Sequence, residues 1–155
     1  MNGTNDKRRL YMIREVEKND LDALLRLYMQ LHDNPMPEKT VELSQIWDNM
    51  IQDKDHHVIV AEENGEIVSS CVCVIIPNLT HNQQPYAFIE NVITDERHRN
   101  KGLATQCLDY AKGIAIKENC YKMMLLTGSK KESTLDFYRK AGYNSDDKMA
   151  FIQWI

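Results

Sequence analysis

The sequence lacks both the long apolar runs of a membrane protein and the clustered basic residues of a nucleic-acid binder. No stretch approaches the roughly 20 apolar residues of a membrane span, and the first residues lack the apolar core of a signal peptide. A formal net charge of −4 argues against general binding to DNA or RNA phosphates. We therefore expect a cytoplasmic protein that binds neither membranes nor nucleic acid.

The cysteines form no recognisable metal or redox motif. The sequence has neither a Cys-x-x-Cys pair nor a histidine at zinc-finger spacing. Cys71 and Cys73 lie two residues apart in an expected strand and so share a face, but two further ligands for a metal are missing there. Free thiols behave as small hydrophobic side chains. We therefore expect reduced, mostly buried cysteines, Cys107 and Cys120 included, and no metal.

The composition is that of one ordinary domain. With 155 residues, of which 43% are hydrophobic and 27% charged, the chain is long enough to bury a core without a second domain. Residues 1–10 are polar and show no periodicity. We expect them to form a flexible arm, followed by a single domain over residues 11–155.

The first half of this domain reads as one strand and two helices. Residues 11–16 alternate as in a strand, and Asn19 or Asp20 can then cap a helix that runs to about His32. Two prolines end this helix. A second amphipathic helix follows, with an expected buried stripe of Leu43, Ile46, Trp47, Met50 and Ile51.

The second half begins with a predicted hairpin. Residues 58–62 and 66–76 have strand composition, and the Asn64-Gly65 pair between them is among the strongest hairpin signals. The later expected elements are a polar loop over 77–85, a strand over 86–94, a helix from 103 to about 119, a strand over 121–127, a helix over 133–141 that stops at Gly142, and a last strand over 148–155.

The order of these elements predicts the fold class. The strand, helix and strand between residues 86 and 127 imply a parallel pair joined by a right-handed crossover, whereas the hairpin is antiparallel. We expect an α/β (α+β) fold with a mixed, mostly antiparallel central sheet of about six or seven strands. About four helices would flank both faces of this sheet.

The most informative stretch runs from Tyr86 to Ala104. Its first half suits a strand, although Glu90 and Asn91 interrupt the apolar pattern. Its second half, here called the basic loop (residues 97–102), ends at Gly102, where a helical pattern begins. The first turn of a helix has free N–H groups and the positive end of the helix dipole. The sequence therefore predicts an anion site, with a solvated basic turn as the alternative.

Two motifs resemble those of the GNAT superfamily of N-acetyltransferases. Arg99-Asn100-Lys101-Gly102-Leu103-Ala104 matches the pattern Arg/Gln-x-x-Gly-x-Gly/Ala, the acetyl-CoA signature of that family. One strand later, the segment 136–143 resembles the family's Phe-Tyr-x-x-x-Gly-Phe/Tyr segment, and the element order matches from Tyr11 to Ile155. The resemblance implies a GNAT-like fold and an acetyl-CoA-dependent N-acetyltransferase without a metal.

The resemblance also implies how acetyl-CoA is held. Backbone N–H groups at the helix start would hold the pyrophosphate, and Gly102 would let the backbone come close. The pantetheine arm would lie along the strand, with the Val92 N–H donating to the thioester carbonyl. Thr134 stands where many relatives have an Asn that touches the coenzyme. The implied donor-binding residues are Val92, Ile93, Thr94, Arg97, Arg99, Asn100, Lys101, Gly102, Leu103, Ala104 and Thr134.

Glu90 and Tyr138 are the candidate catalytic residues. An amine must lose a proton to act as a nucleophile, and Glu90 can accept it directly or through water; a solvent-facing or Arg-paired carboxylate is the alternative. Asn91 stands where some relatives have Asp. The resemblance implies that Tyr138 protonates the departing thiolate, and an aromatic core with Phe137 and Tyr143 is its alternative. We expect direct transfer to a primary amine in a ternary complex.

Alternatives stay open for the acceptor, for the oligomeric state and for the activity itself. The resemblance implies that the acceptor enters over about residues 28–47 and the 77–85 loop, with His32, Asp33, Glu38 and Trp47 as candidate lining residues; ordinary surface and core roles are the alternative. Residues 89–94 and 120–122 resemble the glucosamine-phosphate acetyltransferase subgroup, although Thr127 does not supply the acidic residue that this subgroup has after the strand. Polyamines, amino acids, peptide N-termini and aminoglycosides stay open. A homodimer through residues 149–155 is a family-level expectation, and a non-catalytic acyl-CoA-binding or regulatory module is the alternative function.

Overall fold

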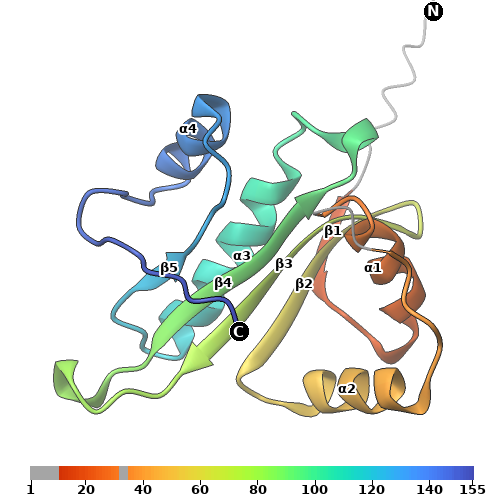
Figure 1. Cartoon of the computed structure of the whole chain (residues 1–155), viewed down its shortest axis with the longest axis horizontal. Coiled ribbons are helices and arrows are strands. Elements are labelled where there is room, and N and C mark those ends of the chain that lie inside the picture. The colour runs from red at the N-terminus through yellow and green to blue at the C-terminus, as the bar shows by residue number, and fades with distance from the viewer. Residues whose placement is uncertain (1–10, 32–34) are drawn as a thin grey trace, which may run out of the picture.

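In the part of the chain that the structure describes, five strands form a single sheet with helices on both faces (Figure 1). The computed structural model describes residues 11–31 and 35–155, so the predicted arm over residues 1–10 lies outside the described residues. Neighbouring strands are antiparallel, except that β4 and β5 are parallel. The predicted fold class is confirmed. The elements are β1 (Tyr11–Glu15), α1 (Leu21–Tyr28), α2 (Val41–Gln52), β2 (His56–Glu63), β3 (Glu66–Ile76), β4 (Tyr86–Thr94), α3 (Leu103–Lys117), β5 (Met123–Leu125) and α4 (Glu132–Lys140), with short 3₁₀ turns η1 (Lys18–Asp20), η2 (His81–Gln83) and η3 (Glu96–His98).

The predicted hairpin is confirmed. Asn64 and Gly65 connect β2 to β3 and have φ angles of 53° and 84°. Two successive left-handed residues are what a two-residue hairpin turn requires, because their twist matches that of the strands. This turn fixes the register of β2 against β3.

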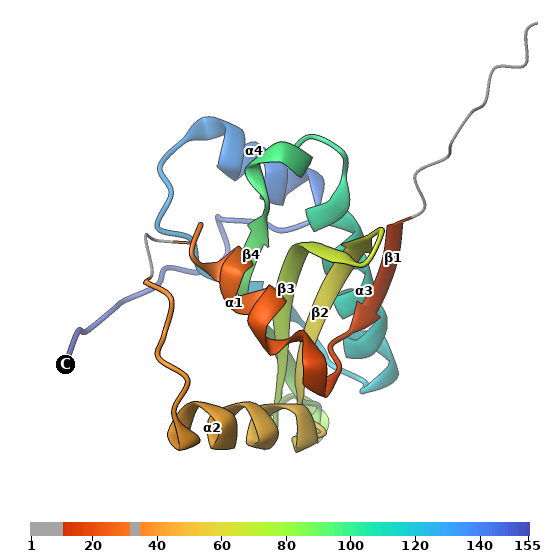
Figure 2. The same cartoon turned by 90° about the vertical axis from the view of Figure 1, so that its right-hand side faces the viewer.

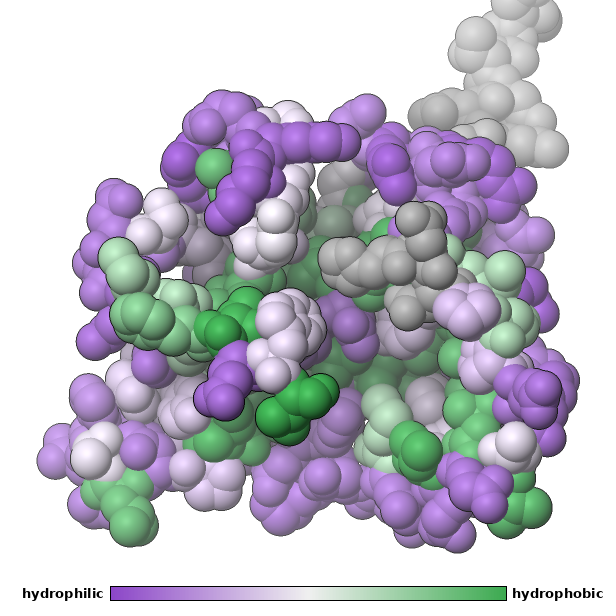
Figure 3. Space-filling view, viewed as in Figure 1, coloured by the Kyte–Doolittle hydropathy of each residue, from purple (hydrophilic) through white to green (hydrophobic). Residues whose placement is uncertain are grey.

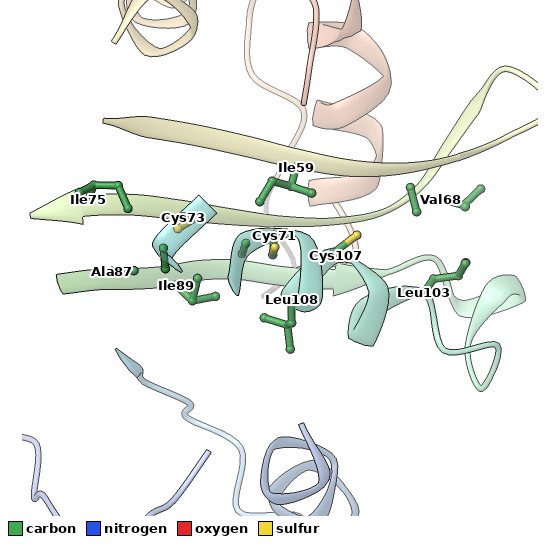
Figure 4. Close-up of a cluster of buried hydrophobic side chains, with 13 residues drawn as sticks. Ile59, Val68, Cys71, Cys73, Ile75, Ala87, Ile89, Leu103, Cys107 and Leu108 are labelled. Carbon is green, nitrogen blue, oxygen red and sulfur yellow. The ribbon is translucent and has the colours of Figure 1, made fainter. Parts of the chain in front are cut away.

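Each face of the sheet has its own core. Figures 1 and 2 show α3 on one face and α1 with α2 on the other. Leu103, Cys107 and Leu108 of α3 pack over β3 and β4. Cys71 and Cys73 of β3 belong to the same core (Figure 4). All four cysteines are free thiols and three of them are buried, as predicted, whereas Cys120 is only half-buried. The opposite core consists of Leu24, Trp47, Val58, Val60 and Val72.

Two helix predictions need correction. Ile46 was expected on the buried stripe of α2, but it is 57% exposed, because only the Trp47 side of this helix packs on the sheet. The first helix ends at Tyr28 rather than near residue 32, since the N–H of Gln30 turns back to the Leu27 carbonyl at 3.1 Å in a tighter, 3₁₀-type bond. In the described residues no helix combines the length and the apolar character that crossing a bilayer requires.

The predicted last strand is wrong. Residues 148–155 have no regular secondary structure, so the described part of the chain has a five-stranded sheet rather than one of six or seven strands. The segment is apolar on both alternating faces, yet Phe151 and Trp154 are 90% and 89% exposed. A strand needs a neighbour for its backbone groups, and this segment pairs with none of the described strands.

Candidate active site

A bulge interrupts β4 beside β3. Ser70 pairs with Ile93, but Val72 pairs with Glu90, so two steps along β3 face three steps along β4. The additional residue is accommodated at Asn91, whose φ of 49° is left-handed. Asn tolerates this region better than most residues. As a result, Glu90 and Asn91 are both exposed, whereas regular alternation along the strand would have buried one of the two side chains.

The parallel strands next to this bulge separate into a cleft. β4 and β5 are paired only from Ala87–Met123 to Ile89–Leu125, and β5 then ends. Beyond that point lies a cleft of about 240 Å³, and the space-filling view shows the surface hollowed between the α4 side and the α1 side (Figure 3). The cleft is lined by Leu31, Ile89, Glu90, Asn91, Val92, Leu125, Leu126, Thr127, Gly128, Ser129, Thr134 and Tyr138.

The structure brings both candidate catalytic residues to this cleft. Glu90 comes from β4 and Tyr138 from α4, and Val92 and Thr134 line the cleft with them. The Thr134 hydroxyl accepts a hydrogen bond from the Ser129 hydroxyl at 3.2 Å. The carboxylate and the phenol therefore border one space, although 47 residues of chain lie between Glu90 and Tyr138.

Tyr138 lies at the border between the cleft and the core. Its ring packs against Phe137 at 4.9 Å between centroids and meets Tyr143 edge to face. Burial raises the pKa of the Tyr138 phenol above its ordinary value. The hydroxyl therefore stays protonated at neutral pH, which suits a proton donor. Tyr138 thus belongs both to the aromatic cluster and to the wall of the cleft.

The basic loop has the backbone geometry of an anion site. Asn100 and Gly102 have φ angles of 60° and 74°, and Gly102 is the N-cap residue of α3. Within the described residues no side chain caps this helix, and its first backbone bond runs from the Gln106 N–H to the Gly102 carbonyl at 3.0 Å. The N–H groups of the first turn therefore remain available to a bound anion. A Cβ at position 102 would enter space that is open in this structure.

The basic side chains of the loop have different surroundings. Arg97 is paired with Asp95, with 3.1 Å between Nε and Oδ1, so part of its charge is already neutralised. Arg99 donates from Nε to the Thr94 carbonyl at 3.3 Å and is exposed, as is Lys101. Arg99 and Lys101 are therefore better placed than Arg97 to add charge beside a phosphate.

Four further residues that were predicted to bind the donor, Ile93, Thr94, Leu103 and Ala104, do not line the cleft. The side chains of Leu103 and Ile93 are buried at 1% and 7% exposure, and the Ile93 carbonyl accepts from Ser69 at 2.9 Å. The Thr94 hydroxyl is 2.8 Å from that of Ser69. Ala104 is half-buried in the first turn of α3. Of the β4 residues predicted to bind the donor, Val92 is the one that lines the cleft.

Of the named acceptor candidates that the structure describes, none lines the cleft. Trp47 is a core residue, 4% exposed, and its indole N–H donates to the Lys18 carbonyl at 2.9 Å. The 77–85 loop leads into the start of β4, and none of its residues lines the cleft, which lies beside the second half of that strand. Glu38 is exposed and is also absent from the cleft lining. His32 and Asp33 lie outside the described residues.

Several cleft residues escaped the sequence prediction. Gly128 and Ser129 follow β5 at the point where the two parallel strands separate, and Leu31 comes from the end of α1. The rule that ligands bind beyond the carboxyl ends of parallel strands could have located the first two. Leu31 was not singled out, but it falls within residues 28–47, the segment expected to meet the acceptor. The described residues contain no cluster of three or more His, Cys, Asp or Glu side chains suited to a metal.

Comparison with known proteins identifies the family of this chain. The model of the acetyltransferase (GNAT) family matches residues 21–143. Glucosamine 6-phosphate N-acetyltransferase from Trypanosoma brucei brucei is 30% identical over 140 residues, which cover 88% of this chain and 90% of that protein. Spermidine N(1)-acetyltransferase from Escherichia coli K12 is 28% identical over 113 residues, 72% of this chain and 58% of that protein.

A solved structure shares the whole fold. A putative acetyltransferase from Agrobacterium tumefaciens str. C58 superimposes with a TM-score of 0.85 at 34% identity, over 92% of this chain and 99% of that one. The family match covers the basic loop, the β4 bulge and the Tyr138 segment together. The chain therefore belongs to the GNAT family and is an acetyl-CoA-dependent N-acetyltransferase.

Proposed function

We propose that the protein transfers an acetyl group from acetyl-CoA to a primary amine by direct attack in a ternary complex. One observation carries this proposal: Glu90 and Tyr138 reach the same cleft from β4 and α4, at the end of the sheet where the basic loop lies. A base and an acid on two walls of one cleft are what amine acylation needs.

The reaction can be written with this chain's residues. The amine nitrogen attacks the thioester carbonyl carbon, and Glu90 receives the amine proton directly or through water. The Val92 N–H, which belongs to the bulge, donates to the carbonyl oxygen as negative charge develops there. The C–S bond then breaks, and Tyr138 gives its hydroxyl proton to the thiolate of coenzyme A.

The donor would occupy the cleft and the basic loop. We assign the pyrophosphate to the N–H groups of Asn100 to Ala104, with added charge from Arg99 and Lys101. The pantetheine arm would run past Val92 to Thr94, with Thr134 on the opposite wall. The open space at Gly102 and its left-handed φ of 74° support close approach of the backbone to a phosphate.

The buried thiols favour direct transfer over an acyl-cysteine intermediate. Burial raises the pKa of Cys107 to about 11 and that of Cys73 to about 12, so these thiols remain protonated and poorly nucleophilic at neutral pH. Neither residue lines the cleft. Mass spectrometry after incubation with acetyl-CoA alone should therefore detect no acylated cysteine. Four free thiols also suit a reducing compartment, for which we propose the cytoplasm.

A phosphorylated amino sugar is the acceptor to test first. The supporting observation is the 30% identity to a glucosamine 6-phosphate N-acetyltransferase over most of both chains. The second candidate class is a polyamine, because a spermidine N(1)-acetyltransferase is also a relative.

A thiol-release assay tests both the activity and the acceptor. Glucosamine 6-phosphate, spermidine, an aminoglycoside and a peptide with a free N-terminus would each be supplied with acetyl-CoA. We expect release of coenzyme A that depends on one acceptor class. Tight acetyl-CoA binding without acceptor-dependent release across the panel would instead support the non-catalytic acyl-CoA-binding module.

We further propose a homodimer in which residues 149–155 of each chain pack on the other. Met149, Phe151, Ile152, Trp154 and Ile155 are between 61% and 120% exposed. Hydrophobic side chains lie on the surface around the C-terminal end in Figure 3. Among the described strands β5 has a neighbour on one side only, and it therefore offers an edge to which a further strand can pair.

A further inference from the structure

One short turn at the end of α1 contacts both parts of the proposed site. The turn, here called the α1 end, comprises residues 28–31 and is closed by the bond from the Leu31 N–H to the Tyr28 carbonyl at 2.9 Å. Tyr28 lies beside Ser70 and Asn91, and burial raises the pKa of its phenol to about 12. Leu31 lines the cleft. The α1 end is therefore a wall of the cleft.

Gln30, from the same turn, holds the start of η3. Its side-chain N–H donates from Nε2 to Oδ2 of Asp95 at 3.0 Å. Its side-chain carbonyl Oε1 accepts from the backbone N–H of Glu96 at 3.1 Å. The amide nitrogen and the amide oxygen of Gln30 thus bind Asp95 and Glu96, the two residues that immediately precede the basic loop. The bond to the Asp95 carboxylate is charge-assisted and stronger than a neutral one.

Asp95 connects this contact to the basic loop itself. It is 7% exposed and accepts from the Arg97 backbone N–H at 2.9 Å, from Arg97 Nε, and from His98 Nδ1 at 3.2 Å. The hydrogen bond from Arg97 is the main reason why the pKa of Asp95 lies well below its usual range. The carboxylate is therefore ionised, and its position fixes the first half of the basic loop.

The other side of the loop is fixed to the sheet. His98 Nε2 lies 2.8 Å from Oε2 of Glu63, which is the last residue of β2 and is itself 7% exposed. The imidazole thus stands between two carboxylates, Glu63 and Asp95. The basic loop has one attachment to the rigid sheet through His98 and one to the cleft wall through Gln30.

We propose that Gln30 is a positioning residue that couples acetyl-CoA binding at the basic loop to the order of the cleft wall. The inference rests on the proposed function. A pyrophosphate held by the basic loop restricts Asp95 and Glu96, and Gln30 transmits that restriction to Tyr28 and Leu31. Because such coupling is reciprocal, a molecule that orders the α1 end also strengthens acetyl-CoA binding.

Gln30 can be removed without opening the core. Its side chain is exposed, whereas α1 is held by Leu24 and Leu27, which are 2% and 3% exposed. Replacing Gln30 therefore tests the coupling without disturbing the packing that holds α1. Gln45 is a matched control, since it is also an exposed glutamine, although it lies within α2, and it donates only locally, to Asn49 at 3.0 Å.

The experiment compares hydrogen exchange and acetyl-CoA affinity in four proteins: wild type, Gln30→Ala, Gln30→Glu and Gln45→Ala. In the wild type and in Gln45→Ala, acetyl-CoA should slow exchange in residues 95–104 and also in residues 24–31. In Gln30→Ala the protection should remain in 95–104 and disappear from 24–31, with a Kd raised about fivefold. Gln30→Glu should weaken binding further, because its carboxylate would face that of Asp95.

The outcomes separate this inference from the proposed function. Equal protection of residues 24–31 in the wild type and Gln30→Ala, at unchanged Kd and melting temperature, would overturn the coupling and leave the acetyltransferase assignment intact. Failure of the wild type to bind acetyl-CoA would overturn the proposed function and the coupling together. A kcat that stays constant while KM for acetyl-CoA rises in Gln30→Ala would support positioning over a direct catalytic role.

Discussion

Tyr138 and Tyr143 meet edge to face, with 6.1 Å between ring centroids and an angle of 83° between the planes, but only Tyr138 lines the cleft. Tyr143 points its hydroxyl into the interior, where it has no hydrogen-bond partner among the described residues. Two phenols of one aromatic cluster therefore differ in their access to a substrate. This difference supplies a test of catalysis with an internal control.

Replacing Tyr138 by Phe should lower kcat about 100-fold or more, because the thiolate would leave without a proton donor. The KM for acetyl-CoA should change little, since the ring and its packing remain. Steady-state kinetics with the acceptor found in the panel measures both constants. Tyr143→Phe should keep kcat within about twofold. Equal losses in the two variants would mean that the cluster matters for packing and that Tyr138 is not the acid.

Glu90→Gln should lower kcat/KM about 100-fold while acetyl-CoA binding is retained. The side chain keeps its size and can still contact the acceptor, but it can no longer accept a proton from the amine. The measurement is kcat/KM for the acceptor together with the acetyl-CoA Kd from calorimetry. Glu42→Gln, an exposed carboxylate in the first turn of α2, is the control and should behave as wild type. Wild-type turnover by Glu90→Gln would exclude Glu90 as the base.

Gly102→Ala should raise the acetyl-CoA Kd at least about tenfold and lower the free energy of unfolding by about 1 kcal/mol. The φ of 74° is strained for alanine, and the new methyl group would enter the open space above the helix start. Gly113→Ala is the matched control in the same helix, at ordinary φ and also in open space. It should stabilise the protein by about 0.5–1 kcal/mol and leave the Kd unchanged. Unaltered affinity in Gly102→Ala would contradict a phosphate site at this turn.

The sequence predicted those features that depend on local chemistry. Asn64-Gly65 determines its hairpin through two left-handed residues, and the spacing from Leu103 to Ala115 determines the buried face of α3. The family motifs located Gly102 and Tyr138. Each of these signals lies within a few consecutive residues, or within one helix.

The features that were missed depend on long-range pairing. The bulge at Asn91 exists because β4 is one residue longer than its partner segment of β3, which neither strand reveals alone. The Gln30–Asp95 contact joins residues 65 positions apart. The segment 148–155 has strand composition, but composition does not supply the neighbouring strand that a sheet requires.

Trp154→Asp should convert a wild-type dimer into a monomer. An aspartate in an apolar interface would lose water without gaining a partner, whereas the present side chain is exposed in the single chain and has no packing to lose. Light scattering after gel filtration measures the mass. Val41→Asp, at an apolar position of α2 that is 80% exposed, should remain dimeric. A wild type that is monomeric at micromolar concentration would refute the dimer.

The buried thiols should make stability fall at alkaline pH. Burial raises the pKa of Cys107 to about 11 and of Cys73 to about 12, whereas the same thiols in an unfolded chain ionise near 9.0. The stabilisation from keeping them neutral is therefore complete below pH 9 and is lost as the pH rises through about 11 to 12. Above pH 9 each thiol contributes a slope of up to about 1.4 kcal/mol per pH unit to the free energy of unfolding.

Urea unfolding at pH 8, 9, 10 and 10.5 measures this slope. Cys107→Ala should be less stable than the wild type at pH 8, because a cavity replaces the sulfur, but its stability should fall less steeply above pH 9. Cys120→Ala serves as the control, because Cys120 is only half-buried and should leave the slope nearly unchanged. If Cys107→Ala and the wild type lose stability in parallel, other groups cause the alkaline decline. The half-buried tyrosines Tyr28 and Tyr143, whose pKa values are also raised by burial, would then be the next to replace.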